Sequence, residues 1–325
     1  PLKDSELKLN KFAKIKGEEN LFLADPFIYK IDPARYLSFS KTILLKPNLF
    51  DEIKSLRIEI EEYSEKKIIY DKFNPKIEDI LKALDFPKAD LTKANFFEKS
   101  DAILKDLSSY RYFFKELAAS LKFNPLSKKH PTDLVVEKLI YLLKEYSLSI
   151  KPKVLLFKAA AYFVEDGIIC GSNGIKFASR KLTKNFILSE ENNSTDIFIY
   201  VATIGGKIDD EIKKLADSGD IFESYMLNGI GGAAAEMAAH DLNIYFNEAL
   251  NKGSVDFAFN RYSPGYGDWD VADQKKIFSL LNPQKHIGVN LSDSFLMYPE
   301  KSTSGVIGLV DKPADYSTTH SGKTN

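Results

Sequence analysis

The spacing of apolar residues changes character near residue 130. Residues 1–50 alternate short apolar pieces with prolines, which predicts an irregular arm with one or two short strands. Parts of residues 51–121 carry apolar side chains at helical spacing in a background rich in Lys and Glu. Prolines and polar residues interrupt this spacing over residues 124–133. We therefore predict a helix-rich N-terminal region of unknown role over residues 1–130, and a separate domain over residues 131–325.

The second region mixes strand-like and helix-like periodicity, which places the chain in the α/β (α+β) class. The dipeptide Asp166-Gly167 between two apolar runs predicts a hairpin. Residues 197–203 form the most continuous apolar run and predict a buried strand. The other predicted strands are 154–157, 168–171 and 303–310, and the predicted helices are 134–146, 177–188, 207–218, 222–250 and 271–281.

Charge and cysteine content narrow the class of function. The 45 basic and 46 acidic side chains leave a formal net charge of -1, which does not favour nucleic acid or an anionic membrane as a partner. The apolar runs are far shorter than the roughly 18 residues that span a bilayer. Cys170 is the single cysteine, so no internal disulfide forms and a reducing, cytoplasmic location is predicted. The chain starts at Pro1 without methionine, which is compatible with a fragment or a trimmed chain.

Two segments look like phosphate-binding loops but lack the required context. Gly322-Lys323-Thr324 ends like a Walker A loop, yet Ser317 stands where the earlier glycine is needed and no helix follows. The run 229–234 has the glycines of a dinucleotide fingerprint, but it lies in the middle of a predicted helix. The four histidines are scattered along the sequence, so no metal site is predicted.

The helix predicted over residues 222–250 contains two further features of note. Three glycines, at positions 229, 231 and 232, cost roughly 3 kcal/mol of helix propensity relative to alanine, so a close approach of another backbone or a ligand must offset them. Glu236 follows these glycines and stands four residues before His240. It can be a solvated carboxylate, a carboxylate paired with His240 at little energetic gain, or a carboxylate that binds a cationic or hydroxyl-bearing ligand.

The segment from Arg261 to Trp269, with the sequence RYSPGYGDW, cannot form a regular helix. Pro264 fixes its own φ, and Gly265 and Gly267 can adopt positive φ. The segment therefore predicts an ordered loop with aromatic walls and one guanidinium. Its composition is compatible with a turn whose aromatic side chains fill a core, and also with a loop that holds a flat, partly charged ligand.

Several separated pieces of sequence, taken together, resemble one known family. The pieces are 202–206 with 209–211, 231–236, 261–269, 285–299 and 302–305. In order and spacing they resemble the S-adenosylmethionine-binding activation (reactivation) domain of cobalamin-dependent methionine synthase, over about residues 133–316. The resemblance implies a C-shaped fold with a bent, mostly antiparallel sheet flanked by helices, here with a helix-rich N-terminal extension.

The resemblance also implies a function. The family binds S-adenosylmethionine and supports reductive methylation of inactive cob(II)alamin, with an electron from flavodoxin, ferredoxin or a similar donor. This chain has no Asp-x-His-x-x-Gly loop for cobalamin, so the corrinoid would be carried by a partner methyltransferase such as methionine synthase. Two alternatives stay open: a non-catalytic corrinoid-protein binding module or chaperone without S-adenosylmethionine, and a free-standing methyltransferase with an unrelated substrate.

Carried onto this sequence, the family's motifs assign binding roles but no acid–base catalyst and no metal ligand. Arg261 would pair with the ligand's carboxylate, and Glu236 would contact the ligand from its helix. Tyr266 would lie beside the ligand and face the corrin. The implied ligand-binding residues are Glu236, Arg261, Tyr262, Ser263, Pro264, Gly265, Tyr266 and, from a looser alignment, Tyr316.

Overall fold

The structure is a computed structural model, and it describes only part of the chain. The described residues are 11–18, 20–24, 55, 112–113, 115–117, 119–121, 133–171, 174–188, 194–250 and 257–311. Tyr316 and most of the helices predicted before residue 122 lie outside these residues. The described residues fall into two compact units. The first takes its residues from 1–30, 151–209 and 235–325, and the second from 31–150 and 210–234.

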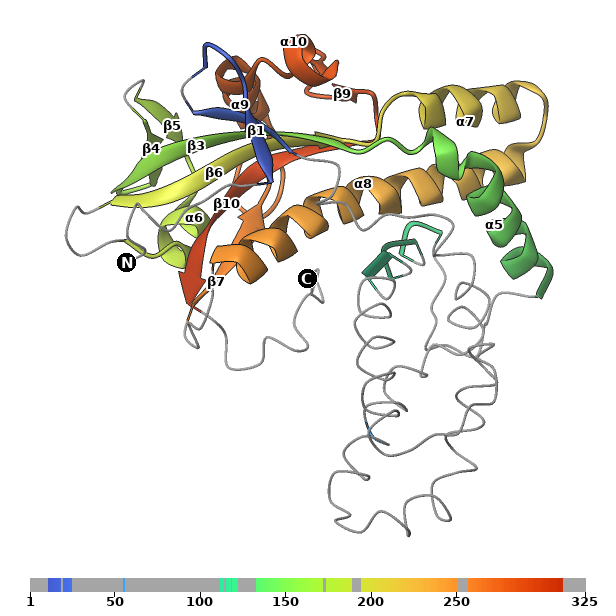
Figure 1. Ribbon diagram of the computed structural model, residues 1–325, viewed down its shortest axis with the longest axis horizontal. Coiled ribbons are helices and arrows are strands. Elements are labelled where there is room, and N and C mark those ends of the chain that lie inside the picture. Colours follow the sequence, from blue (N-terminus) through green and yellow to red (C-terminus); the bar gives the residue numbers. More distant parts are fainter. Residues whose placement is uncertain are drawn as a thin grey trace. The chain divides into compact units, whose positions relative to one another are not determined.

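An antiparallel sheet forms the centre of the first unit. Its strands follow the order β1-β2-β3-β6-β10-β7, with β4 and β5 added beside β3 (Figure 1). Every pairing in it is antiparallel, which confirms the predicted fold class. Its strands are β1 (Phe12–Lys14), β2 (Leu21–Ala24), β3 (Lys153–Val164), β4 (Gly167–Cys170), β5 (Ile175–Phe177), β6 (Ser194–Thr203), β7 (Phe257–Tyr262) and β10 (Ser302–Asp311).

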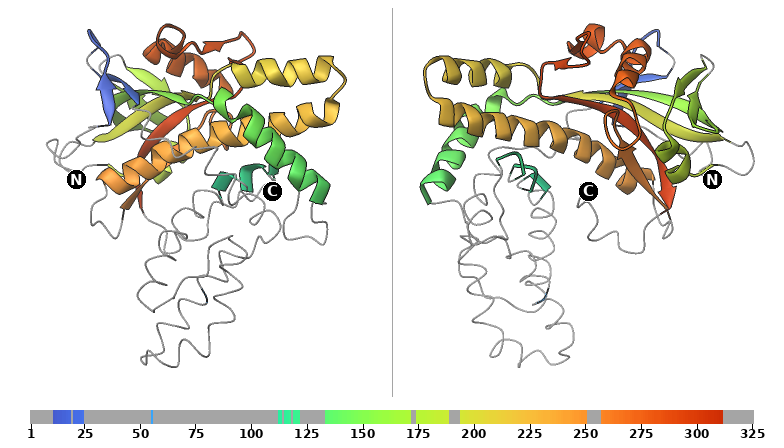
Figure 2. Two further views of the ribbon diagram at one scale, coloured as in Figure 1. Left: turned by 45° about the vertical axis from the view of Figure 1, so that its right-hand side comes forward. Right: turned by 180° about the vertical axis from the view of Figure 1, so that it is seen from behind.

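The run predicted as a buried strand, β6, is the middle of this sheet. Alternate side chains of β6 point to opposite faces, and both faces are covered. Ile197, Ile199 and Val201 join one core together with residues of α9 (Gln274–Leu281) and α10 (Pro283–Ile287). Phe198 and Tyr200 join a second core on the other face, together with the C-terminal half of α8 (Ile221–Leu250) (Figures 1 and 2). A continuous apolar strand is the expected sequence of such a position.

The remaining helices are close to their predicted ranges, with one correction. They are α5 (Asp133–Tyr146), α6 (Arg180–Asn185) and α7 (Lys207–Asp217), with single 3-10 turns η2 (Ser147–Ser149) and η3 (Val271–Asp273). The predicted helix 177–188 was wrong at its start, because residues 175–177 pair with β4 instead. Gly167 permits this pairing, since a Cβ there would collide with the Phe177 carbonyl. The helix then begins after Ser179, whose hydroxyl accepts the Leu182 N–H as its N-cap.

Two short strands from the start of the chain belong to the same sheet. β2 pairs with β3, with Leu21 opposite Phe157, and β1 pairs with β2. The predicted short strands in this arm are therefore confirmed. The domain boundary predicted between residues 130 and 131 stays a prediction. β1 and β2 precede this boundary, yet they belong to the same sheet as the strands that follow it.

Two of the three glycines of α8, Gly229 and Gly232, are explained by packing within the second unit. A Cβ on Gly229 would lie 2.7 Å from Cδ2 of Leu121, whose side chain is buried. A Cβ on Gly232 would lie 3.7 Å from Oγ of Ser120. Side chains of Leu117, Ser120 and Leu121 thus lie against these two glycines, and no ligand is required there. Within the described residues, no helix is long and apolar enough to cross a membrane.

Candidate functional site

Arg261 and Glu236, both predicted as binding residues, form an ion pair with each other. Nη2 of Arg261 donates to Oε2 of Glu236 across 2.7 Å, and the side chains are 15% and 35% exposed. Arg261 comes from β7 and faces α8, because it alternates with Phe259, which belongs to the core on that side. The sequence left three possibilities for Glu236: a solvated carboxylate, a pair with His240, or a carboxylate that binds a ligand. The structure instead places it against a guanidinium 25 residues further along the chain.

Tyr262, the next residue, points to the opposite face of the sheet. Its ring packs edge-on against Phe186, with centroids 5.3 Å apart, and Nζ of Lys181 lies 5.7 Å from the ring centre. Nδ2 of Asn260 donates to its hydroxyl at 3.4 Å. The Tyr262 side chain is therefore part of the packed framework. Its backbone, in contrast, leads directly into the loop that follows.

The loop after β7 is closed by its own backbone. The Gly265 N–H donates to the Trp269 carbonyl at 2.7 Å, and the Tyr266 N–H donates to the Ser263 carbonyl at 3.4 Å. Gly265 has φ +90°, a conformation that favours glycine. Pro264 is buried whereas Tyr266 is 69% exposed, so the loop presents an aromatic ring on an ordered base.

The far end of the loop is tied to the rest of the first unit. Trp269 is buried, and its Nε1 donates to Oδ2 of Asp273 at 2.9 Å. Asp268 accepts the Ser179 hydroxyl at 2.7 Å and the Arg180 N–H at 2.8 Å, at the start of α6. These bonds, first of all the one from Ser179, lower the pKa of the Asp268 carboxyl. Trp269 thus fits the interpretation of a turn whose aromatic side chains fill a core, whereas ligand binding by the exposed middle of the loop stays a prediction.

Gly305 on β10 lets the loop lie close to the sheet. A Cβ at this position would collide with the Tyr262 carbonyl oxygen and would lie 3.0 Å from both the Ser263 hydroxyl oxygen and Cε1 of Tyr200. Gly305 is opposite Tyr200 on β6, in the same register that puts Ile307 opposite Arg261 on β7. Gly305, Tyr200 and Arg261 therefore share the α8 face of the sheet. A side chain at position 305 would displace the start of the loop.

The first and last of the sequence pieces also meet. Ser302 Oγ donates to Thr203 Oγ1 at 2.9 Å, and the Glu300 N–H donates to Oδ2 of Asp209 at 2.8 Å. Burial raises the pKa of the Asp209 carboxyl, and the bond from Glu300 opposes this. Nζ of Lys301 lies 4.0 Å from the other carboxylate oxygen of Asp209, which is an ion-pair distance but too long for a hydrogen bond. The segment 299–302 is thereby fixed to the start of α7.

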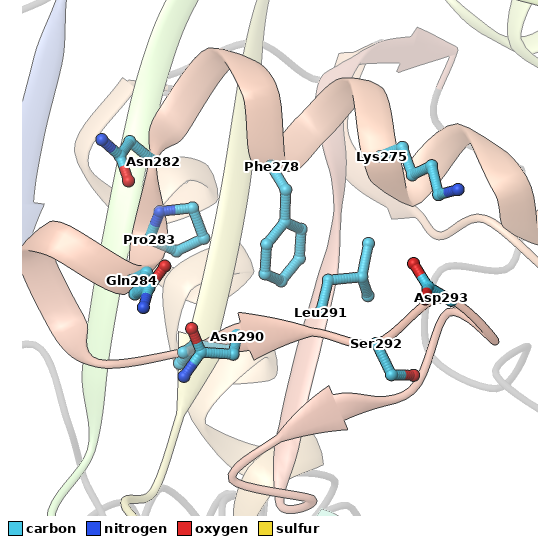
Figure 3. Close-up of a pocket in the computed structure, with 10 residues that line it drawn as sticks. Lys275, Phe278, Asn282, Pro283, Gln284, Asn290, Leu291, Ser292 and Asp293 are labelled. Atoms are coloured by element: carbon cyan, nitrogen blue, oxygen red, sulfur yellow. The ribbon is translucent and has the colours of Figure 1, made fainter.

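A hollow of about 300 Å³ lies elsewhere, between α9, α10 and the two-stranded sheet of β8 (Asn290–Leu291) and β9 (Met297–Tyr298) (Figure 3). Phe278 and Leu291 point toward each other at its centre, and polar side chains, among them Asn282 and Asp293, surround them. Because α9 and α10 cover the face opposite α8, this hollow does not contain the Arg261–Glu236 pair. No group of metal-binding side chains occurs among the residues that the structure describes.

Comparison with known proteins agrees with this assembly of pieces. Residues 178–323 match the family model "Vitamin B12 dependent methionine synthase, activation domain". The resemblance inferred from the sequence is thus confirmed for that stretch, which contains Glu236, the whole 261–269 loop and Gly305. A search of curated proteins finds no match. Among solved structures, the chain is similar to the "MetH Reactivation Domain bound to AdoHcy", at 18% identity and a TM-score of 0.43, over 60% of this chain and 72% of that chain.

Among the predicted site residues, the structure brings Arg261, Glu236 and Ser263 to one face and turns the Tyr262 side chain away. Two residues that lie beside these were not singled out from the sequence. Tyr200 was assigned only to a buried strand, because an apolar run gives no signal for a hydroxyl next to a site. Gly305 belongs to a sequence piece that carried the resemblance, but its contact with the loop depends on strand register.

Proposed function

We propose that this protein binds S-adenosylmethionine at Arg261 and Glu236, and that it supports reductive methylation of cob(II)alamin on a partner corrinoid-dependent methyltransferase such as methionine synthase. The observation that carries the proposal is the half-buried Arg261–Glu236 pair, at 2.7 Å, beside the ordered loop 262–269. The match of residues 178–323 to the activation domain supports the same assignment.

The charges of the pair are complementary to an amino-acid ligand with a sulfonium group. A guanidinium carries five N–H donors in a planar fork, so Arg261 can bind a carboxylate while Nη2 keeps Glu236 in place. The negative charge of the Glu236 carboxylate would then stabilise a positive group of the ligand nearby. Backbone groups from Tyr262 to Gly265 would bond the adenosyl part, and positive φ at Gly265 shapes that backbone.

The protein's contribution would be positioning. S-adenosylmethionine supplies a methyl group on a sulfonium, which needs no acid–base residue for its activation. Arg261 and Glu236 would fix the amino-acid end, and the exposed ring of Tyr266 would face the corrin of the partner. One electron would come from flavodoxin, ferredoxin or a similar donor. Tyr316 belongs to the same proposed set of ligand contacts, and a cytoplasmic location is part of the proposal.

Calorimetry on the full chain tests the proposal. S-adenosylmethionine should bind with measurable heat, and Arg261→Ala should weaken binding between tenfold and a hundredfold, since a hydrogen bond to a charged group contributes about 1.5–3 kcal/mol. Arg180→Ala is the matched control, because the Arg180 side chain is exposed on α6. Equal binding by Arg261→Ala and by the control would exclude the assigned site.

A second function from another class makes a different prediction. A non-catalytic corrinoid-protein binding module would capture a cob(II)alamin-loaded methyltransferase domain but give no heat with S-adenosylmethionine. Under the first proposal, methyl transfer to that loaded domain in the presence of a one-electron reductant would require this chain. Under the second, it would not. Turnover with no corrinoid present would instead indicate a free-standing methyltransferase.

A further inference from the structure

The hydroxyl of Tyr200 is buried without a hydrogen-bond partner among the described residues. Tyr200 is fully buried in the middle of β6, and its hydroxyl oxygen makes no hydrogen bond to any residue that the structure describes. Buried polar groups are nearly always hydrogen-bonded, and each exception calls for an explanation. A phenylalanine would fill the same space with no unpaired group, so packing alone does not account for tyrosine at this position.

The surroundings of Tyr200 connect it to the candidate site. Its ring edge, at Cε1, lies 3.0 Å from the position that a Cβ on Gly305 would occupy, and the Ser263 hydroxyl oxygen lies at the same distance from that position. Gly305 is two residues before Ile307 on β10, and Ile307 is opposite Arg261. Tyr200 therefore lies on the α8 face, across β10 from β7, and is displaced from Arg261 toward the loop that begins at Ser263.

We propose that the Tyr200 hydroxyl, together with the Ser263 hydroxyl, forms hydrogen bonds with the ribose of the bound nucleoside. This inference rests on the proposed function. With the ligand's carboxylate on Arg261 and the rest of the ligand extending along residues 262–265, the ribose is the part that follows the amino-acid end. Hydroxyl groups both donate and accept, so two protein hydroxyls are suited to the hydroxyls of a sugar. Tyr200 is fully buried in this structure, so the proposal includes a shift of the start of the loop when the ligand binds.

Tyr200→Phe in the full chain tests this role. The variant should bind S-adenosylmethionine about tenfold more weakly than the native chain, which is the effect of one lost hydrogen bond. Its thermal midpoint should be unchanged or higher, because the substitution removes a buried unpaired hydroxyl. Tyr162→Phe is the matched control, since the Tyr162 ring on β3 is 48% exposed. A purely structural Tyr200 would not lower affinity while leaving stability intact.

The outcomes separate this inference from the proposed function. If Tyr200→Phe binds S-adenosylmethionine as the native chain does while Arg261→Ala does not, the role of Tyr200 is wrong and the proposed function stands. If the native chain gives no heat with S-adenosylmethionine, both are wrong. Ser263→Ala provides a second measurement: it should weaken binding of the nucleoside S-adenosylhomocysteine as well, and unchanged affinity in both variants would overturn the ribose contact.

Discussion

The Asn247 side chain hydrogen-bonds both backbone groups of Phe259. Its Oδ1 accepts the Phe259 N–H at 2.8 Å, and its Nδ2 donates to the Phe259 carbonyl at 2.9 Å. Among the strands that the structure describes, β7 is the last in the order of its sheet, so Phe259 presents these groups along the outer edge. A single carboxamide on α8 thus replaces part of the missing neighbouring strand. Covering an edge in this way also protects it from pairing with another chain.

We expect Asn247→Ala to lower the free energy of unfolding by about 1–3 kcal/mol, because both backbone groups of Phe259 lose their partner. Arg261 lies two residues further along β7, so affinity for S-adenosylmethionine should fall as well. Urea denaturation and calorimetry provide the two measurements. Asn290→Ala, at an exposed position of β8, is the control and should change neither.

Gly229 and Gly232, two of the three glycines of α8, should respond differently to alanine. Gly232→Ala should stabilise the protein by up to about 1 kcal/mol, since alanine favours the helix and its Cβ would make an ordinary contact with Ser120. Gly229→Ala should lose this gain or destabilise, because its Cβ would lie 2.7 Å from Cδ2 of the buried Leu121. Thermal midpoints measured side by side decide this. Equal stabilisation by both substitutions would contradict the packing described for residues 117–121.

Cys170 should report on unfolding. Burial raises the pKa of its thiol from 9.0 to about 12, so almost no thiolate exists at pH 8 in the native protein. Alkylation by iodoacetamide at pH 8 should therefore be slow until denaturant is added. The same shift stabilises the folded state fully below pH 9, and this stabilisation is lost as the pH rises from about 9 to about 12. Rapid alkylation of the native chain would show that the thiol is accessible.

Asp268 should contribute to stability at neutral pH but not in acid. Its pKa is lowered in the folded state, so its stabilising effect is present above its unfolded pKa of about 4 and is lost as the pH falls through the lower, folded value. Thermal midpoints of the native chain and of Asp268→Asn should therefore differ at pH 7 and converge in strong acid. Asp293→Asn, at an exposed carboxylate near β9, serves as the reference substitution. A constant difference at all pH values would contradict the role of the charge.

Gly305→Ala should disturb the site without touching a charged residue. A Cβ at this position collides with the Tyr262 carbonyl, which is backbone and cannot rotate away. We expect a loss of about 1–3 kcal/mol of stability, as for other overpacked positions, together with weaker binding of S-adenosylmethionine. Gly308→Ala on the same strand is a useful comparison, because its Cβ would meet only the ring of Phe186. Native-like binding by Gly305→Ala would show that the loop adjusts freely.

The features that were predictable from sequence are those encoded within one segment. A continuous apolar run predicted β6, and apolar residues at helical spacing predicted α8. In both cases the pattern of apolar residues lies within the segment itself. The start of α6 was not predictable, because it depends on Asp268, 89 residues after Ser179, and on the pairing of residues 175–177 with β4. Local pattern cannot reveal such a partner.

The candidate site shows the same limit. Arg261 and Glu236 were each recognisable from the pieces of sequence around them, but their contact depends on which face of β7 meets α8. Tyr200 was not identified, because it stands in an apolar run of β6. Its position near Ser263 depends on the pairing of β6 with β10. The roles of these residues in ligand binding stay predictions until the binding measurements are made.

The alternation of Arg261 and Tyr262 on β7 makes the site sensitive to strand register. Neighbouring residues of a strand face opposite sides, so a slip of one residue would put the tyrosine ring against α8 and force the guanidinium into the opposite core. β7 is aligned by its pairing with β10 and by the bonds from Asn247. Insertion or deletion of a single residue within β7 should therefore abolish binding more completely than any point substitution in the loop.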